Sequence, residues 1–147
     1  MDIDKVQAEW VLGRFPVEQL PEFAAQAIRE GFRGPNLREM TKARRPRWMS
    51  DELVDGAFRE LGRDPITPLQ AVERLACFVA RRILQEQTAP LDGAQQIATL
   101  LRRFDCDDVP EPLRRFRWEQ EGGRRALRDR EQIVGLAWEL LEKDPAP

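Results

Sequence analysis

The residues best suited to binding chemistry lie in two short basic segments that share the pattern Arg-x-Arg-Trp. The first is Arg45-Pro46-Arg47-Trp48 and the second is Arg115-Phe116-Arg117-Trp118. With the arginine that precedes each segment, the candidate partner-binding residues are Arg44, Arg45, Arg47, Trp48, Arg114, Arg115, Arg117 and Trp118. Arginine beside an exposed tryptophan suits the centre of a protein interface, or phosphate contact combined with base stacking. The structural alternative is that each tryptophan anchors a connector on the core while the arginines point into solvent.

Both segments concentrate positive charge in a chain whose formal net charge is only -2. Residues 33–49 hold six basic groups and one acid, and residues 113–130 hold seven basic groups and three acids. The remaining stretches are mostly acidic. Opposed patches can steer a charged partner, although isolated surface charges often do no more than face water. We therefore expect a protein partner bound through charged patches. Nucleic acid is the alternative, less favoured because the acidic remainder would repel a phosphate backbone.

The side chains that most enzymes use are missing or scattered. The chain has no histidine and no tyrosine, and Ser50 is its only serine, so neither a Ser-His-Asp nor a Cys-His site can form within it. Cys77 and Cys106 lack the spacing of metal ligands, and Cys77 lies in an apolar stretch that predicts a reduced core residue. We predict no catalytic residues, no metal site and no cofactor. Acid-base chemistry through Asp and Glu alone stays open as an alternative.

One acidic run is spaced partly like the ligands of a calcium-binding loop. Asp105, Asp107, Asp108 and Glu111 partly match the spacing of a calcium loop, but its central glycine and its terminal glutamate at the required offset are missing. We interpret the run as a solvated loop that ends a helix.

The elements that must position these segments are helices, because apolar residues recur at helical spacing and no segment alternates with a period of two. We expect helices over Ile3–Leu12, from Leu20 to just before Gly31, through Leu37 and Met40, from Ser50 to Leu61, from Thr67 to Gln87, from Asp92 to Phe104, over Leu113–Glu121 and over Arg125–Lys143. The sequence thus predicts an all-α, single-domain bundle of about six to eight helices spanning residues 1–147. Residues 144–147 would form a frayed tail.

Capping residues mark several of these ends. Asp2 or Asp4, Ser50, Thr67 and Asp92 are expected N-caps. The helix that follows Thr67 carries the longest apolar stripe and is predicted to be central. Gly135 inside the last helix predicts a close approach of another helix there, since glycine otherwise weakens a helix.

The pair of helices between Ser50 and Gln87 invites comparison with a DNA-reading helix-turn-helix motif. The connector Gly62–Ile66 is longer than the usual turn, and the second helix begins with few polar side chains. Leu69, Val72 and Leu75 instead mark it as a core helix, so we do not expect DNA reading by this pair.

A pattern in the first third of the chain resembles one found in small uncharacterised all-helical bacterial proteins. It consists of Leu20-Pro21 with Ala24, then Ala27-Ile28 and Gly31, then Pro35 with Leu37-Arg38-Glu39-Met40. The resemblance implies a helical fold and carries no activity with it.

The first residues, Met1-Asp2-Ile3-Asp4-Lys5, do not form a signal peptide, and no apolar run is long enough to span a membrane. We expect a cytoplasmic, non-membrane protein-interaction module of the size of an immunity protein or a small adaptor. Homodimerisation is a further alternative, because periodicity does not distinguish an exposed apolar stripe from a core one.

Overall fold

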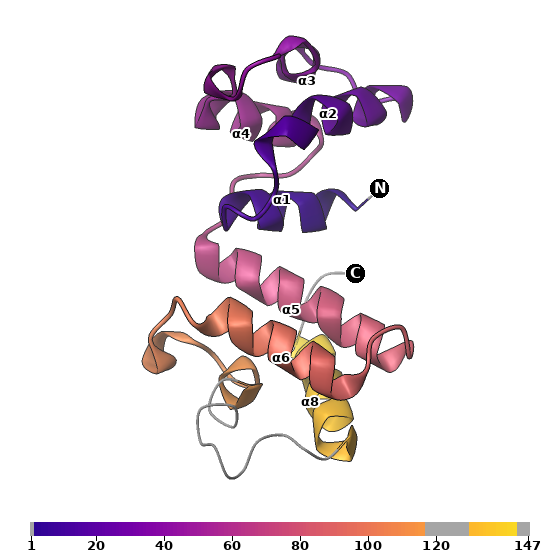
Figure 1. Ribbon diagram of the computed structural model, residues 1–147, viewed down its shortest axis with the longest axis vertical. Coiled ribbons are helices and arrows are strands. Elements are labelled where there is room, and N and C mark those ends of the chain that lie inside the picture. The colour runs from indigo at the N-terminus through magenta and orange to yellow at the C-terminus, as the bar shows by residue number, and fades with distance from the viewer. Residues whose placement is uncertain (1, 117–129, 144–147) are drawn as a thin grey trace. The chain divides into compact units, whose positions relative to one another are not determined.

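The computed structural model describes residues 2–116 and 130–143, and this part of the chain is helical with no strand. Its α-helices are α1 (Ile3–Val11), α2 (Leu20–Arg29), α3 (Pro35–Lys42), α4 (Asp51–Glu60), α5 (Pro68–Leu84), α6 (Pro90–Leu101) and α8 (Arg130–Lys143) (Figure 1). Residues 113–116 are also helical, and 3₁₀ turns cover Val17–Gln19, Pro46–Trp48 and Cys106–Asp108. The predicted all-α class is therefore confirmed. Within the described residues, no helix is both long and apolar enough to cross a membrane.

The chain forms two compact units, residues 1–71 and 72–147, and each is described by itself. We call them unit 1 and unit 2. A single domain over residues 1–147 stays a prediction, as does the frayed tail 144–147, which lies outside the described residues.

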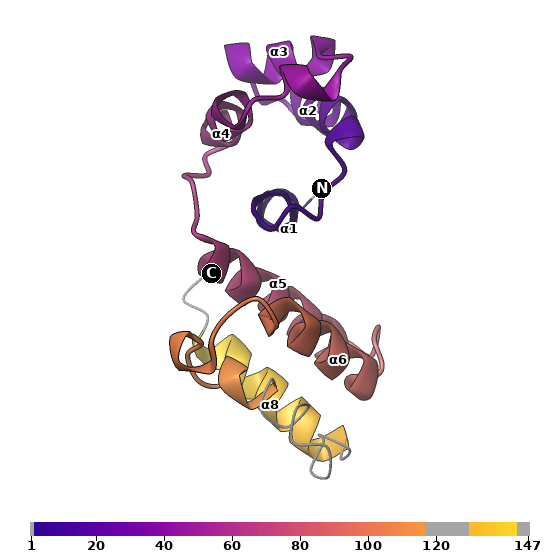
Figure 2. The ribbon, with the colours of Figure 1, turned by 60° about the vertical axis from the view of Figure 1, so that its left-hand side comes forward.

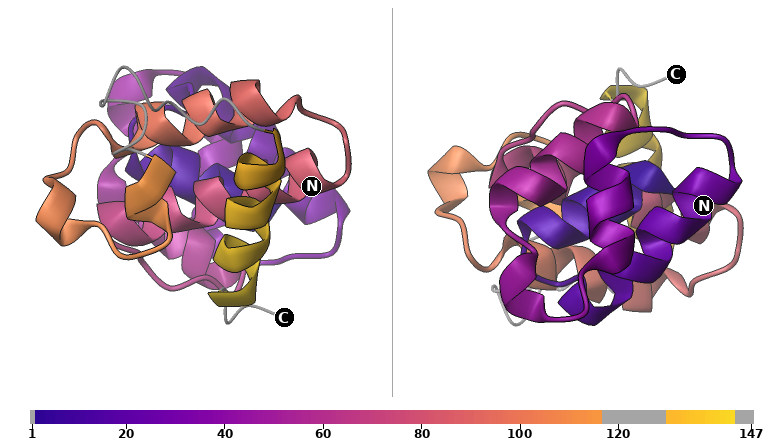
Figure 3. Two further views of the ribbon diagram at one scale, coloured as in Figure 1. Left: turned by 90° about the horizontal axis from the view of Figure 1, so that it is seen from below. Right: turned by 90° about the horizontal axis from the view of Figure 1, so that it is seen from above.

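Unit 1 is built around α2, α3 and α4, with α3 packed against both of the others (Figures 2 and 3). Phe23 lies at the middle of its core, with ring-centroid distances of 6.3 Å to Phe15 and 5.7 Å to Phe58. The other buried core residues are Leu20, Ala24, Ala27, Leu37, Met40, Met49, Val54, Ala57 and Leu61. They recur at the helical spacing that the sequence predicted, so apolar burial explains why these segments fold as helices.

Unit 2 contains most of α5, together with α6 and α8, and α6 packs against α8 (Figure 2). Buried apolar side chains include Val79 and Ile83 of α5, Ile97 of α6 and Ile133 of α8. Cys77 is buried and forms no disulfide bond, as predicted for a reduced core residue.

Three of the predicted caps are present. The Asp2 side chain accepts a hydrogen bond from Lys5 N at 3.0 Å, and Ser50 Oγ accepts one from Leu53 N at 3.1 Å. At the start of α5, Thr67 and Gln70 bond reciprocally: Gln70 N donates to Thr67 Oγ1 at 3.1 Å and Thr67 N donates to Gln70 Oε1 at 2.9 Å. This reciprocal pair is a capping box, which satisfies two backbone donors at once.

Several predicted helix ends are wrong. α6 begins at Pro90 with Ala89 as its N-cap, so Asp92 lies in the first turn and is not a cap. α6 also ends at Leu101, which leaves the half-buried Phe104 beyond it. α5 ends at Leu84 and not Gln87, because Glu86 adopts a left-handed conformation (φ 59°) that cannot continue a helix. The predicted helices Leu113–Glu121 and Arg125–Lys143 are described only in part, because residues 117–121 and 125–129 lie outside the described residues.

The close helix approach predicted at Gly135 occurs at Gly93 instead. Gly135 is exposed, and a Cβ placed there would meet nothing within 4 Å among the described residues. A Cβ at Gly93 of α6 would lie 2.5 Å from Ile83 Cδ1 of α5. Gly93 is therefore the residue that lets α5 and α6 approach each other.

Replacing Gly93 and Gly135 by alanine is expected to change stability in opposite directions. G93A should lower the free energy of unfolding by about 1 kcal/mol, since overpacking outweighs the gain in helix propensity. G135A should raise it by about 0.5–1 kcal/mol, because only the propensity term acts there. Urea unfolding followed by circular dichroism measures both, and equal shifts for the two variants would contradict the assignment.

Candidate functional site

The first Arg-Trp segment follows α3, and α3 is held by a carboxylate from α4. Its N-cap residue, Gly34, has no side chain with which to cap the helix. Glu60, the last residue of α4, supplies the missing acceptor. Its Oε1 accepts from Leu37 N at 2.8 Å, and its Oε2 accepts from Asn36 N at 3.0 Å and Asn36 Nδ2 at 2.9 Å. A negative charge is favourable at a helix N-terminus, so Glu60 fixes where α3 begins.

Two glycines make room for this contact, which we call the Glu60 cap. A Cβ on Gly34 would overlap the Glu60 carboxyl group. A Cβ on Gly56, one turn before Glu60 in α4, would lie 2.6 Å from Asn36 Nδ2. Both positions must therefore stay small for α3 and α4 to meet as they do.

From α3 onward, a row of cations faces solvent. We define the Arg/Trp surface as the side chains of Arg38, Lys42, Arg44, Arg45, Arg47 and Trp48, all of which are exposed. On the opposite side of this stretch, Leu37, Met40 and Met49 are buried in the core of unit 1. The connector is thus anchored before and after the cationic residues.

Four of the five cations of this surface have no partner within the described residues. Among the described residues, the charged groups of Arg38, Lys42, Arg44 and Arg47 form neither an ion pair nor a side-chain hydrogen bond. Arg45 stacks on Trp48, with its guanidinium carbon 5.6 Å from the ring centroid. Trp48 keeps 50% of its surface exposed, whereas Met49 is 8% exposed. Met49 is therefore the main anchor of the connector, and Trp48, half of whose surface is covered, anchors it only in part. The exposed arginines agree with the structural alternative, which stays open for this segment.

The second Arg-Trp segment differs, because its described arginines are bound internally. Arg114 Nε donates to Val109 O at 3.0 Å. Arg115 pairs with Glu111 at 3.4 Å and with Glu139 of α8 at 3.2 Å. Arg117 and Trp118 lie outside the described residues. The two segments belong to different units. Within the first, Arg45 contacts Trp48, and Arg44 and Arg47 adjoin them in sequence.

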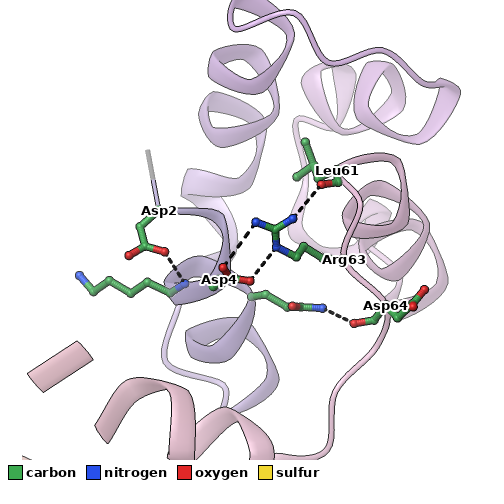
Figure 4. Close-up of polar contacts among 7 residues, drawn as sticks. Asp2, Asp4, Leu61, Arg63 and Asp64 are labelled. Atoms are coloured by element: carbon green, nitrogen blue, oxygen red, sulfur yellow. Dashed lines mark hydrogen bonds and ion pairs between the residues drawn. The ribbon is translucent and has the colours of Figure 1, made fainter. Parts of the chain in front are cut away.

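A second polar cluster, shown in Figure 4, ties α1 to the residues after α4. Arg63 Nε donates to Asp4 Oδ1 at 2.7 Å, and Gln7 Nε2 donates to Asp64 O at 2.8 Å. Gln7 is only 2% exposed, so its hydrogen bond removes the cost of burying an amide. This cluster holds the fold together, and its partners are too far apart in sequence for any local pattern to have indicated them.

The acidic run lies in and around the 3₁₀ turn Cys106–Asp108. Asp105, Asp107, Asp108 and Glu111 are exposed there, in agreement with a solvated loop. In residues 2–116 and 130–143, no three His, Cys, Asp or Glu side chains gather as metal ligands would. The absence of a cofactor stays a prediction.

One carboxylate in an apolar setting was missed by the sequence analysis. Glu73 is half-buried in α5, and burial raises the pKa of its carboxyl group. Within the described part of the chain, it has no ion pair or hydrogen bond. Since Glu73 has no charged partner, this observation alone indicates no chemistry.

Replacing Glu73 by glutamine is expected to stabilise the protein at neutral pH. A carboxyl group whose folded pKa is raised favours the folded state below its unfolded pKa, and this contribution is lost as pH rises through the folded value. The stability gained by E73Q should therefore be larger at pH 7 than at pH 4. Parallel urea titrations of E73Q and the natural protein at both values measure the difference, and an equal gain at both pH values would refute it.

No protein-family model, curated protein or solved structure matches this chain. The resemblance to small helical bacterial proteins thus stays a prediction. The Arg/Trp surface is the feature that points to a function.

Proposed function

We propose that the protein is a non-catalytic interaction module that binds a protein partner through the Arg/Trp surface of unit 1. The observation that carries the proposal is the set of exposed cations without described ion pairs beside a half-exposed tryptophan, on which one of them, Arg45, stacks. Arginine and tryptophan are enriched among interface hot spots, the residues whose replacement by alanine weakens binding most.

Other arginines in unit 1 show what an internally engaged cation looks like. Arg63 pairs with Asp4 at 2.7 Å, and Arg29 pairs with Glu22 at 2.8 Å. A partner that bound those groups would first have to break an existing ion pair. The cations of the Arg/Trp surface require no such exchange, and neither do Arg14 and Arg59 of unit 1. The exposed Trp48 beside the former is what favours the Arg/Trp surface as the binding site.

Acidic neighbours favour a protein over nucleic acid as the partner. Glu39 lies in α3 between Arg38 and Lys42, and Asp51 and Glu52 begin α4 just after Trp48. All three acids are exposed. They would repel a continuous phosphate backbone, whereas a protein surface can place basic or neutral groups opposite them. Cys77 is in no disulfide bond, which agrees with a reducing compartment, and we include a cytoplasmic location in the proposal.

The test is an affinity pull-down from the native host after nuclease treatment, read by mass spectrometry. We expect one protein in stoichiometric amount, retained at moderate salt. Material recovered only when nuclease is omitted would replace the proposal with the nucleic-acid alternative. A chain that elutes as a clean monomer with no partner at low salt would refute both.

A further inference from the structure

We infer that the partner meets the Arg/Trp surface with a short acidic segment that carries an apolar side chain among its carboxylates. This inference rests on the proposed function and specifies the chemistry of the partner. It follows from the charge of the surface, from the acids that adjoin it in sequence and from its exposed tryptophan.

The charge of the surface requires an anionic partner. Arg44, Arg45 and Arg47 fall within four consecutive positions, and Arg38 and Lys42 lie one helical turn apart on α3. A guanidinium group offers a planar fork of donors that a carboxylate matches with two parallel hydrogen bonds. Carboxylates spaced along one segment would therefore engage several of these cations together.

Acids that adjoin the cations in sequence limit how far the anionic charge of the partner can extend. Electrostatic interactions at the surface persist over about 10 Å at 0.1 M salt. Asp51 and Glu52 come only three and four residues after Trp48, and Glu39 follows Arg38 directly. A broad acidic face would meet these carboxylates as well as the arginines. A short acidic segment can contact the cations and end before it reaches the acids.

The exposed ring of Trp48 is the reason why the partner segment should carry an apolar side chain. The ring is 50% exposed and carries the Arg45 guanidinium 5.6 Å from its centroid. A segment with carboxylates alone would leave the exposed part of the ring in water. An apolar side chain between the carboxylates would cover it and gain the free energy of burying aromatic surface.

The backbone of the connector already forms a turn without a partner. Trp48 N donates to Arg45 O at 2.9 Å, which closes the turn, and the buried Met40 and Met49 flank the connector in sequence. Less conformational freedom is then lost on binding, so a short segment suffices for measurable affinity.

The experiment measures fluorescence anisotropy of three labelled probes added to the full-length protein at low salt. The probes are a peptide of Asp and Glu with a central Leu-Phe pair, the same peptide with that pair replaced by Ser-Ser, and single-stranded DNA of equal length. We expect the Leu-Phe peptide to bind most tightly, and the Ser-Ser version to bind about tenfold more weakly. W48A should remove this difference between the two peptides.

Charge-reversal variants test whether the peptide binds at the Arg/Trp surface. R44E/R45E/R47E should abolish peptide binding, whereas R14E/R59E/R102E, which makes the same change in net charge at other exposed arginines, should retain it. Equal binding of the two peptides, tighter binding of DNA, or no peptide binding at all would overturn the inference. If the peptides fail while R44E/R45E/R47E still releases the protein partner in the pull-down, the proposed function stands and only the inference falls.

Discussion

Replacing Glu60 by alanine is expected to lower the free energy of unfolding by about 2–3 kcal/mol. The change removes the acceptor for three donors, including the backbone N–H groups of Asn36 and Leu37. Both groups are partly buried, so solvent replaces the lost hydrogen bonds only in part. The negative charge that stabilises the N-terminus of α3 is lost as well.

Matched variants separate the Glu60 cap from a general loss of negative charge. E39A removes an exposed glutamate from α3 and should change stability by less than about 0.5 kcal/mol. E60Q keeps the size of the side chain but only one acceptor oxygen, so an intermediate loss is expected. Chemical unfolding of the three variants gives the comparison, and equal stability of E60A and E39A would show that the Glu60 cap contributes nothing.

The largest functional effect is expected from R44E/R45E/R47E. Three attractive charges become three repulsive ones at residues that form no described ion pair, so affinity for the protein partner should fall by about 100-fold or more. Stability should change little, because no described ion pair is broken. Titration calorimetry with the purified partner measures the affinity, and thermal unfolding checks the fold.

The matched control is again R14E/R59E/R102E. If net charge alone governed association, both triple variants would weaken binding equally. We expect the control to lose less than about threefold, since its charges lie outside the Arg/Trp surface. A loss of similar size in both variants would remove the case for a defined binding site.

Local features of this fold were predictable from sequence. Ser50 and Thr67 cap the helices that follow them, as expected, because an N-cap side chain bonds to backbone only three residues ahead. Contacts between distant residues were not predictable. Glu60 caps α3 through Asn36, which lies 24 residues earlier in the chain, and no pattern links the two positions.

In the candidate site, too, local features were predictable from sequence and contacts between distant residues were not. The two Arg-Trp segments share one tetrapeptide pattern, so sequence could not rank them. Their difference comes from tertiary partners: Glu139 of α8 reaches Arg115, whereas no described acid pairs with Arg47. Likewise, Gly93 and Gly135 both lie inside helices, and only the packing of Ile83 distinguishes them.

Oxidative footprinting of tryptophan tests the central claim most directly, because the chain contains its own reference. Trp48 and Trp138 are exposed to similar extents, 50% and 57%, and lie in different units. Hydroxyl-radical labelling of the protein with and without its partner, read by mass spectrometry, should show protection of Trp48 and no change at Trp138. Protection of Trp138 with unchanged labelling of Trp48 would contradict the assignment of the Arg/Trp surface as the binding site.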